Sequence, residues 1–437
     1  MQRNAQKLLE KIEKNKMTVG VLGLGYVGLP LAVTFAKKGV TVLGFEKDTK
    51  KAAKVNSGIN YIGDVSDSDL LFCTQKTKDL SATSDFSRIA EVDAVIICVP
   101  TPLDKFKKPD MSYIETACET IAEYMKSGTF IALESTTYPT TTEELMLPIF
   151  ETSGLQLGED FWLCYSPERI DPGNKVYKTD NTPKVVGALG EDASELALAL
   201  YGLAIDTLYP VSSPRVAEMV KILENTYRLV NISLINELAL LSGKMDINIW
   251  EVIDAAKSKP YGFQAFYPGP GIGGHCIPLD PFYLEHIAKN YNFDLTMINA
   301  AGRVDTIMPH RMVVKIGFAL NRHNKPISGS KFLFLGVAYK SDIGDERESP
   351  ALRIISEIDH KGGVVGYNDP YIDTIKVGEE KEFYSVKLTE SALKDADCVV
   401  ITTNHSCYDG EWIAKHAKLV IDLRNSIKNE SDTVVKL

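Results

Sequence analysis

The chain lacks the features that would place it at a membrane or on a nucleic acid. It has no apolar run of membrane-spanning length, and its first residues, up to Met17, are charged, unlike a secretory signal peptide. It also has no block of lysine and arginine interleaved with aromatic residues, and its net charge is −10. We therefore expect a cytoplasmic protein that binds neither membrane nor nucleic acid.

Cysteine is scarce and follows no pattern. The seven cysteines, at positions 73, 98, 118, 164, 276, 398 and 407, are an odd number in a chain of 437 residues and form no Cys-x-x-Cys pair. This spacing excludes a disulfide framework and predicts no metal site. Most of these residues are expected to be small buried hydrophobes.

The composition is that of a large globular protein. Hydrophobic residues make up 44% of the chain and charged residues 24%. Because 437 residues exceed what one ordinary core can hold, the length predicts two or three domains.

A dinucleotide-binding fingerprint stands near the N-terminus. A strand from Thr18 leads into Gly23-Leu24-Gly25-Tyr26-Val27-Gly28, followed by a helix over 29–38 and a strand over 40–45. Gly23 permits the tight turn, Gly25 lets the backbone approach a pyrophosphate, and Gly28 lets helix and strand pack closely. Glu46, about twenty residues on, can accept from the adenosine ribose and would repel the 2′-phosphate of NADP. The order of these parts predicts NAD binding; a purely structural turn is the alternative.

Strands over 94–99 and 130–134 continue this α/β domain with a parallel sheet. Their carboxyl ends carry the small and hydroxyl-bearing segments 99–102 and 134–137. Ligands of such sheets bind beyond the carboxyl ends of the strands, so these segments are suited to line a nicotinamide pocket. Ordinary turns rich in Pro, Ser and Thr are the other interpretation.

Residues 214–241 are predicted to form one long helix, a connector that also offers a dimer face. The prediction rests on apolar residues spaced three and four apart, at Val216, Met219, Val220, Leu223, Tyr227, Val230, Leu234 and Leu238. Lys221 and Asn225 project from one side of it. Together they could donate to an oxyanion on a bound aldehyde, or they could be solvated surface residues.

The α/β pattern returns near Lys331, with strands expected over 331–338, 363–367, 398–402 and 419–422. No Gly-x-Gly-x-x-Gly is present here, so a second dinucleotide is not expected. Lys340, Asp342, Arg347 and Arg424 suit a nucleotide diphosphate or base, unless they form only an exposed charged loop.

Cys276 closes the glycine-rich run 268–276. A thiolate beside a nicotinamide can hold an aldehyde as a thiohemiacetal for a second hydride transfer. The pattern therefore favours oxidation of an alcohol to an acid. His275 could lower the pKa of the thiol or could simply pack in the loop.

The whole chain resembles the UDP-glucose/GDP-mannose dehydrogenase family. The matching motifs are Gly23–Gly28, Val99–Pro102, Glu134–Thr136, Ser166–Arg169, Lys221 with Asn225, Gly273–Asp280, and Lys340 with Asp345–Pro350. Segments 166–173 and 259–276 are most similar to members that oxidise UDP-N-acetylglucosamine.

The resemblance implies two Rossmann-like doubly wound parallel-sheet domains joined by a long helix and a helical domain. The NAD-binding domain would cover residues 1–210, with a short N-terminal helix over 1–16. The dimer-forming helical domain would cover 211–322, and the UDP-sugar domain 323–437. The expected assembly is a homodimer or a higher homo-oligomer.

The resemblance also implies roles for individual residues. Cys276 would be the nucleophile, Lys221 and Asn225 would stabilise oxyanions, and Asp280 would help activate the thiol or a water that Glu168 and Thr136 position. The implied NAD contacts are Gly23, Leu24, Gly25, Tyr26, Val27, Gly28, Glu46, Lys51, Pro100, Thr101, Ser135, Thr136 and Arg347. The implied substrate contacts are Glu168, Arg169, Lys221, Asn225, Arg228, Phe263, Tyr267, Gly269, Gly271, Gly273, Lys340 and Arg424.

The chain departs from the UDP-glucose members at two places. It has Ser166-Pro-Glu-Arg-Ile-Asp171 where they have an Asn-Pro-Glu-Phe-Leu segment and a second acid, and it has no arginine between Lys259 and Cys276. Aromatic residues in that stretch would suit the methyl of an N-acetyl group, which favours UDP-N-acetylglucosamine.

The implied activity is oxidation of UDP-N-acetylglucosamine to its uronic acid with reduction of two NAD, for surface polysaccharide synthesis. The alternatives are the same chemistry on UDP-N-acetylmannosamine or UDP-glucose, a two-electron alcohol dehydrogenase, and a nucleotide-sugar binder without catalysis.

Overall fold

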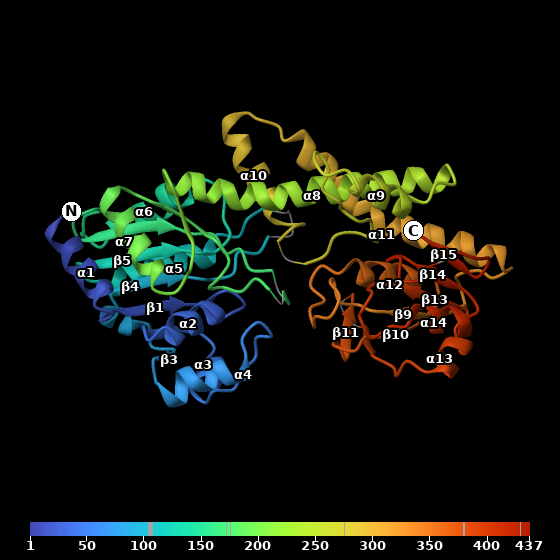
Figure 1. Cartoon of the computed structure of the whole chain (residues 1–437), viewed down its shortest axis with the longest axis horizontal. Helices are drawn as coiled ribbons and strands as arrows, with labels where there is room; N and C mark the ends of the chain where they lie inside the picture. The colour runs from blue at the N-terminus through green and yellow to red at the C-terminus, as the bar shows by residue number, and fades with distance from the viewer. Residues whose placement is uncertain (104–107, 172, 175, 275, 379–380, 429) are drawn as a thin grey trace. The chain divides into compact units, whose positions relative to one another are not determined.

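The structure is a computed structural model that describes residues 1–103, 108–171, 173–174, 176–274, 276–378, 381–428 and 430–437. The chain divides into two compact units (Figure 1). The first contains Met1–Glu224 and Phe282–Phe293, and the second contains Asn225–Pro281 and Asp294–Leu437. His275, whose effect on the thiol the sequence left open, lies outside the described residues.

The first unit is built on an eight-stranded sheet of order β3-β2-β1-β4-β5-β6-β7-β8. Its strands are β1 (Thr18–Leu22), β2 (Thr41–Phe45), β3 (Leu80–Thr83), β4 (Ala94–Ile97), β5 (Thr129–Leu133), β6 (Phe161–Tyr165), β7 (Lys184–Ala188) and β8 (Leu208–Val211). Its α-helices are α1 (Arg3–Glu13), α2 (Gly28–Lys37), α3 (Thr49–Asn56), α4 (Asp67–Leu71), α5 (Ser112–Tyr124), α6 (Leu147–Glu151) and α7 (Glu191–Gly202). Shorter helical segments are η1 (Phe72–Lys76), η2 (Phe86–Glu91) and η3 (Thr141–Met146).

Helices cover both faces of this sheet because its strand residues alternate between two cores. Val21 and Ile96 belong to the core that includes residues of α2 and α7. Leu22 and Val95 belong to the core that includes residues of α5 and α6. The doubly wound arrangement predicted from the sequence is therefore confirmed.

One strand pair departs from the predicted parallel sheet. β7 pairs with β6 in the antiparallel direction, whereas the other neighbouring strands of the sheet are parallel. Parallel neighbours need a crossover, usually a helix. The described part of the 166–183 connection contains no helix, so the chain returns beside β6 in the opposite direction.

The long helix predicted over 214–241 is α8 (Pro214–Lys244), which passes through both units. The other helices between β8 and β9 along the chain are α9 (Ile249–Lys257), α10 (Asp280–Ala288), η4 (Lys289–Tyr291) and α11 (Thr296–Arg322). Six of the eight apolar residues used to predict α8 are exposed, namely Val216, Met219, Leu223, Tyr227, Leu234 and Leu238. α8 thus presents apolar side chains at its surface.

The second unit repeats the arrangement on a smaller scale. Its parallel sheet has the order β10-β9-β13-β14-β15, and a separate antiparallel hairpin joins β11 to β12. The strands are β9 (Lys331–Leu335), β10 (Val364–Asn368), β11 (Thr374–Val377), β12 (Lys381–Tyr384), β13 (Cys398–Ile401), β14 (Val420–Asp422) and β15 (Val434–Lys436). The helices are α12 (Pro350–His360), α13 (Glu390–Asp395) and α14 (Gly410–His416).

The two sheets have the same local topology. In each, the first strand lies between the second strand and a later strand of the chain: β2-β1-β4 in one unit and β10-β9-β13 in the other. Ligand-binding loops therefore belong at the carboxyl ends of these strands. Among the described residues, no helix is long and apolar enough to cross a membrane.

Candidate active site

The glycine-rich turn after β1 has the geometry of a phosphate cradle. Gly23 has a φ of +93°, and a side chain there would strike the Cys98 carbonyl. A Cβ at Gly28 would lie 1.9 Å from the Gly23 carbonyl oxygen, so only glycine lets α2 begin so close to β1. A Cβ at Gly25, by contrast, would meet no atom within 4 Å, which leaves its backbone accessible to a ligand. These features fit a bound pyrophosphate.

Glu46 follows β2 beside this turn. Its Oε2 accepts a hydrogen bond of 3.2 Å from the Leu24 amide, and the carboxylate is half-buried. The position suits a ribose-binding acid. Lys51 lies nearby on α3, with its Nζ 6.0 Å from the centre of the Tyr61 ring. Tyr26 is exposed and Val27 is half-buried.

The predicted nicotinamide segments lie at the carboxyl ends of β4 and β5. The Ser135 hydroxyl donates to the Val99 carbonyl at 2.8 Å, which ties the two segments together. Thr101 is buried and its carbonyl accepts from the Tyr283 hydroxyl, whereas Pro100 is exposed. Thr136 is half-buried at the end of β5.

Lys221 and Glu168 are brought together in the first unit. The Lys221 Nζ donates to the Glu168 carbonyl at 2.6 Å. Glu168 Oε1 accepts from the amides of Arg169 and Ile170, but its buried Oε2 has no hydrogen-bond partner among the described residues. A buried carboxylate oxygen without a donor is suited to hold a water. The Arg169 guanidinium is engaged elsewhere, donating to Glu224 at 2.6 Å.

The second unit contains three of the predicted catalytic residues, Cys276, Asn225 and Asp280. Cys276 is exposed and precedes α10, and its carbonyl accepts from the Asp280 amide at 2.8 Å. The Asp280 carboxylate is buried and accepts from the Asn225 Nδ2 at 2.6 Å. The turn that carries the thiol is thereby joined to α8 through a buried carboxylate and amide.

The glycine-rich loop before Cys276 is held by two residues that sequence reasoning missed. Asn236 of α8 accepts from the Gly269 amide at 2.9 Å, and Asp305 of α11 accepts from the Ile272 amide at 2.6 Å. Both side chains are buried. In the sequence, each of the two is a single polar residue on an otherwise apolar helix face. Such a pattern does not identify the group that the residue binds.

The residues predicted to bind the nucleotide lie at the carboxyl edge of the second sheet. Arg424 follows β14, donates from Nε to the Thr402 carbonyl at 2.9 Å, and lies against Gly269, where a Cβ would be 2.5 Å from Nη1. Burial lowers the pKa of Arg424 to about 10, so it stays cationic at neutral pH.

The remaining predicted contacts sit on the same unit or on α8. Lys340 is half-buried, and Arg347 forms a bidentate pair with Asp345, at 2.9 and 2.6 Å. Two further glycines of the loop pack closely against neighbouring residues. A Cβ at Gly271 would contact Pro350, and a Cβ at Gly273 would be 2.6 Å from Tyr339 Cβ. Arg228, Phe263 and Tyr267 are exposed, and the Tyr267 ring stacks on Trp250 with centroids 6.0 Å apart.

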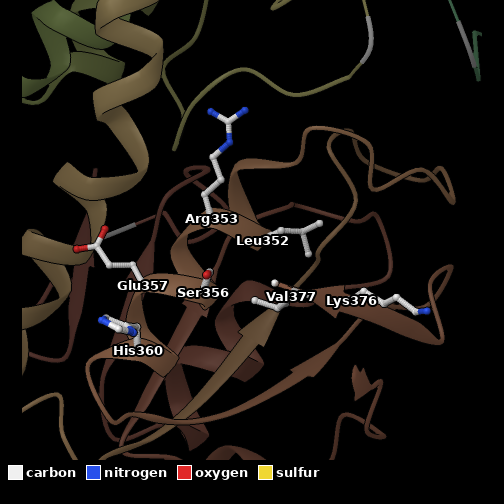
Figure 2. A pocket seen from close by; sticks show the side chains of 8 residues that line it. Leu352, Arg353, Ser356, Glu357, His360, Lys376 and Val377 are labelled. Atoms are coloured by element: carbon white, nitrogen blue, oxygen red, sulfur yellow. The ribbon is translucent and has the colours of Figure 1, made fainter. Parts of the chain in front are cut away.

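A separate cavity of about 530 Å³ lies over α12 and β11 (Figure 2). It is lined by Leu352, Arg353, Ser356, Glu357, His360, Lys376, Val377 and Gly378. Arg353 points out of it to Glu348 at 2.8 Å, and Glu357 is paired with His310 at 2.9 Å. Because it contains no predicted site residue and its charges are paired outward, it is not part of the candidate site. No group of three or more metal-ligating side chains occurs in the described ranges.

Glu218 is a third residue that sequence reasoning missed. Its buried carboxylate, on α8 three residues before Lys221, accepts from the Thr140 amide at 2.7 Å and from the Thr142 amide and hydroxyl at 2.9 and 2.7 Å. It therefore ties α8 to the segment after β5, where Thr140 has a φ of +90°. Burial raises the pKa of Glu218 to about 7, although these hydrogen bonds act in the opposite direction.

This raised pKa predicts a pH-dependent stability. The folded state binds more protons than the unfolded chain between pH 4.5 and about 7, so the contribution of Glu218 to the free energy of unfolding falls as pH rises through that window. We expect the thermal midpoint of the wild type, measured relative to Glu218→Gln, to fall over the same window. An exposed control, Glu195→Gln on α7, should show no such trend. A difference between wild type and Glu218→Gln that is flat from pH 4.5 to 7.5 would contradict the prediction.

Three domain matches cover most of the chain. Residues 17–205 match the NAD binding domain of the UDP-glucose/GDP-mannose dehydrogenase family, residues 215–306 its central domain, and residues 333–429 its UDP binding domain. The predicted boundaries at 210 and 322 remain predictions.

Similar proteins span nearly the whole chain. UDP-N-acetyl-D-mannosamine dehydrogenase of Pyrococcus horikoshii is 35% identical over 417 residues, which are 94% of this chain and 96% of that protein. UDP-N-acetyl-D-glucosamine 6-dehydrogenase of Pseudomonas aeruginosa is 35% identical over 400 residues, 91% of this chain and 90% of that protein. The solved structure of UDP-D-ManNAc dehydrogenase from Pyrococcus horikoshii superimposes with a TM-score of 0.87, at 34% identity, over 96% of this chain and 98% of that one.

These matches agree with the glycine-rich turn after β1, the presence of two Rossmann-like sheets and the order of motifs along the chain. The chain belongs to the UDP-glucose/GDP-mannose dehydrogenase family of NAD-dependent oxidoreductases.

Proposed function

We propose that the protein oxidises UDP-N-acetylglucosamine at C6 to UDP-N-acetylglucosaminuronic acid, a four-electron reaction that reduces two NAD. The observation that carries the proposal is the exposed thiol of Cys276 on a turn joined to Asn225 through the buried Asp280 carboxylate. A simple alcohol dehydrogenase has no use for a nucleophile presented in this way.

NAD, when bound, would supply the hydride acceptor for each of the two oxidations. The residues that fit it are the Gly23–Gly28 cradle with Glu46 for the ribose, and the Ser135–Thr136 segment at the end of β5. Lys51, Thr101 and Arg347 are proposed as further contacts.

The thiolate of Cys276 adds to the C6 aldehyde, forming a C–S bond and an oxyanion. Lys221 and Asn225 are proposed to stabilise this oxyanion, since an ammonium and an amide both donate to developing negative charge. Loss of the second hydride from C6 converts the thiohemiacetal to a thioester. Asp280 positions Asn225 and helps to activate the thiol.

Hydrolysis then releases the acid. Glu168 removes a proton from a water that attacks the thioester carbon, and the C–S bond breaks to regenerate the thiolate. The buried Glu168 Oε2, which has no partner among the described residues, is the proposed acceptor of that proton. Thr136 is proposed to help position this water.

The UDP moiety is assigned to the second sheet, where Lys340 and Arg424 supply positive charge for the diphosphate. Arg169, Arg228, Phe263, Tyr267 and the loop glycines at 269, 271 and 273 are proposed as the other substrate contacts. Relatives at 35% identity include one named for UDP-N-acetyl-D-glucosamine and one named for UDP-N-acetyl-D-mannosamine. Their names support an N-acetylhexosamine, and the similarity of segments 166–173 and 259–276 favours the gluco sugar.

The substrate assignment is tested by measuring kcat/KM for UDP-N-acetylglucosamine, UDP-N-acetylmannosamine and UDP-glucose under identical conditions. We expect the first to be preferred, and UDP-glucose to be the poorest because it lacks the acetamido group. A higher kcat/KM with UDP-N-acetylmannosamine would overturn the gluco assignment but leave the chemistry unchanged.

We further propose that the enzyme acts in the cytoplasm as a homodimer or higher homo-oligomer and supplies uronic acid for surface polysaccharide. The exposed apolar residues of α8 support self-association, because large apolar patches are otherwise rare on monomers. Light scattering coupled to size-exclusion chromatography would measure the assembly directly.

A further inference from the structure

The turns that follow β1 and β9 are built alike. Gly23 has a φ of +93° and donates its amide to the Phe45 carbonyl at 2.8 Å. Gly336 has a φ of +78° and donates its amide to the Asn368 carbonyl at 2.9 Å. A Cβ at either glycine would strike a carbonyl oxygen in the loop after a neighbouring strand of the sheet, that of Cys98 after β4 or that of Thr403 after β13. The first strand of each sheet is therefore followed, at its carboxyl end, by the same kind of turn, which requires glycine.

Each turn is held by an acidic residue that directly follows the second strand of its sheet, β2 or β10. In the first unit, Glu46 accepts from the amide just after the glycine, that of Leu24, at 3.2 Å. In the second, Asp369 Oδ2 accepts from the two amides after the glycine, those of Val337 and Ala338, at 2.7 and 3.1 Å. Asp369 thus occupies the place that the ribose-binding acid occupies in the NAD domain.

The two acids differ in what else they contact. Glu46 is half-buried and faces a cradle open to ligand. Asp369 is 3% exposed, and its Oδ2 takes a third donor, the Nε2 of the buried His405, at 3.0 Å. Its Oδ1 accepts from the Tyr371 amide at 2.9 Å. Because its oxygens are already filled by protein donors, Asp369 is not available to accept from a ribose hydroxyl.

His405 connects this acid to the loop that carries Lys340. Its Nδ1 accepts from the Asp342 amide at 3.0 Å, so the proton of the neutral ring lies on Nε2 and is donated to Asp369. The imidazole is 2% exposed, with the rings of Tyr371 and Tyr408 at 5.1 and 5.5 Å. The loop is therefore held on one side of Lys340 by Asp369 and on the other by His405.

We propose that Asp369 and His405 form a positioning pair for nucleotide binding. Together they fix the backbone from Val337 to Asp342 and so hold Lys340 where it meets the diphosphate of the UDP-sugar. The fixed backbone removes the need to order this loop on binding, which strengthens affinity without altering the chemical step. This inference rests on the proposed function for the identity of the nucleotide.

The test compares His405→Leu, which removes both hydrogen bonds, with His405→Gln, whose amide can still donate to Asp369. Tyr367→Phe is the matched control, since it deletes a buried hydroxyl of β10 that donates to the Ile372 carbonyl at 3.1 Å and not to the 336–342 segment. For His405→Leu we expect the Kd for UDP, measured by titration calorimetry, and the KM for the UDP-sugar to rise about tenfold, with kcat at saturation changed less than about twofold. His405→Gln should show a smaller rise, and Tyr367→Phe none.

Amide hydrogen exchange separates positioning from a general loss of stability. Amide hydrogen exchange of the 336–342 segment should accelerate in His405→Leu and not in Tyr367→Phe. An unchanged Kd for UDP in folded His405→Gln and His405→Leu, or an equal rise in Tyr367→Phe, would overturn the inference. If the wild type binds UDP but oxidises no UDP-sugar, the proposed function fails, while the calorimetric comparison still decides the role of the pair.

Discussion

Replacing Cys276 with serine is expected to lower uronate formation by about a thousandfold or more, while leaving the first oxidation measurable. A serine hydroxyl remains protonated at neutral pH and adds poorly to an aldehyde, and an ester is a less reactive intermediate than a thioester. The aldehyde should therefore accumulate, or remain bound as an adduct that intact-mass analysis detects.

Cys407 supplies the matched control, because it is the other exposed cysteine in the described part of the chain. Cys407→Ser should retain wild-type turnover, which would show that loss of an exposed thiol is not harmful by itself. Equal uronate formation by Cys276→Ser and the wild type would remove the thiol from the mechanism and leave it as a structural residue.

Adding one methyl group to the glycine turn should separate cofactor binding from folding. In Gly25→Ala the new Cβ meets no protein atom within 4 Å, so the thermal midpoint should stay near that of the wild type. The methyl would instead occupy the space where a pyrophosphate approaches the backbone. We expect the Kd for NAD to rise about tenfold or more.

Gly28→Ala should behave in the opposite way. Its Cβ would lie 1.9 Å from the Gly23 carbonyl oxygen, so α2 must move away from β1 and stability should fall by about 3 kcal/mol or more. Gly202→Ala in α7, where the nearest atom would be 3.9 Å away, serves as the control and should be neutral or slightly stabilising. A Kd for NAD in Gly25→Ala equal to that of the wild type would contradict the assignment of the Gly23–Gly28 turn as the pyrophosphate site.

The sequence predicted those parts of the fold that depend on local pattern. The β1 turn and α2 were placed within one or two residues, since buried strands, glycine spacing and helix periodicity are short-range signals. The antiparallel direction of β7 was missed because it depends on the path of the 166–183 connection, which contains no helix in its described part.

The supporting residues of the site were harder to predict than the reactive ones. Cys276 and the glycine loop form a contiguous motif, so they could be recognised from the sequence. Glu218 reaches segment 140–142 across more than seventy residues of sequence, and Asp369 and His405 meet across 36. Such pairs follow from strand order in the folded sheet, and a single sequence carries no signal for them.

The central claim is tested most directly by the number of NADH formed for each UDP-N-acetylglucosamine consumed by the wild-type protein at completion, with the product identified by mass. The account predicts two NADH and the uronic acid. One NADH, with the aldehyde as the final product, would contradict it and leave a two-electron alcohol dehydrogenase.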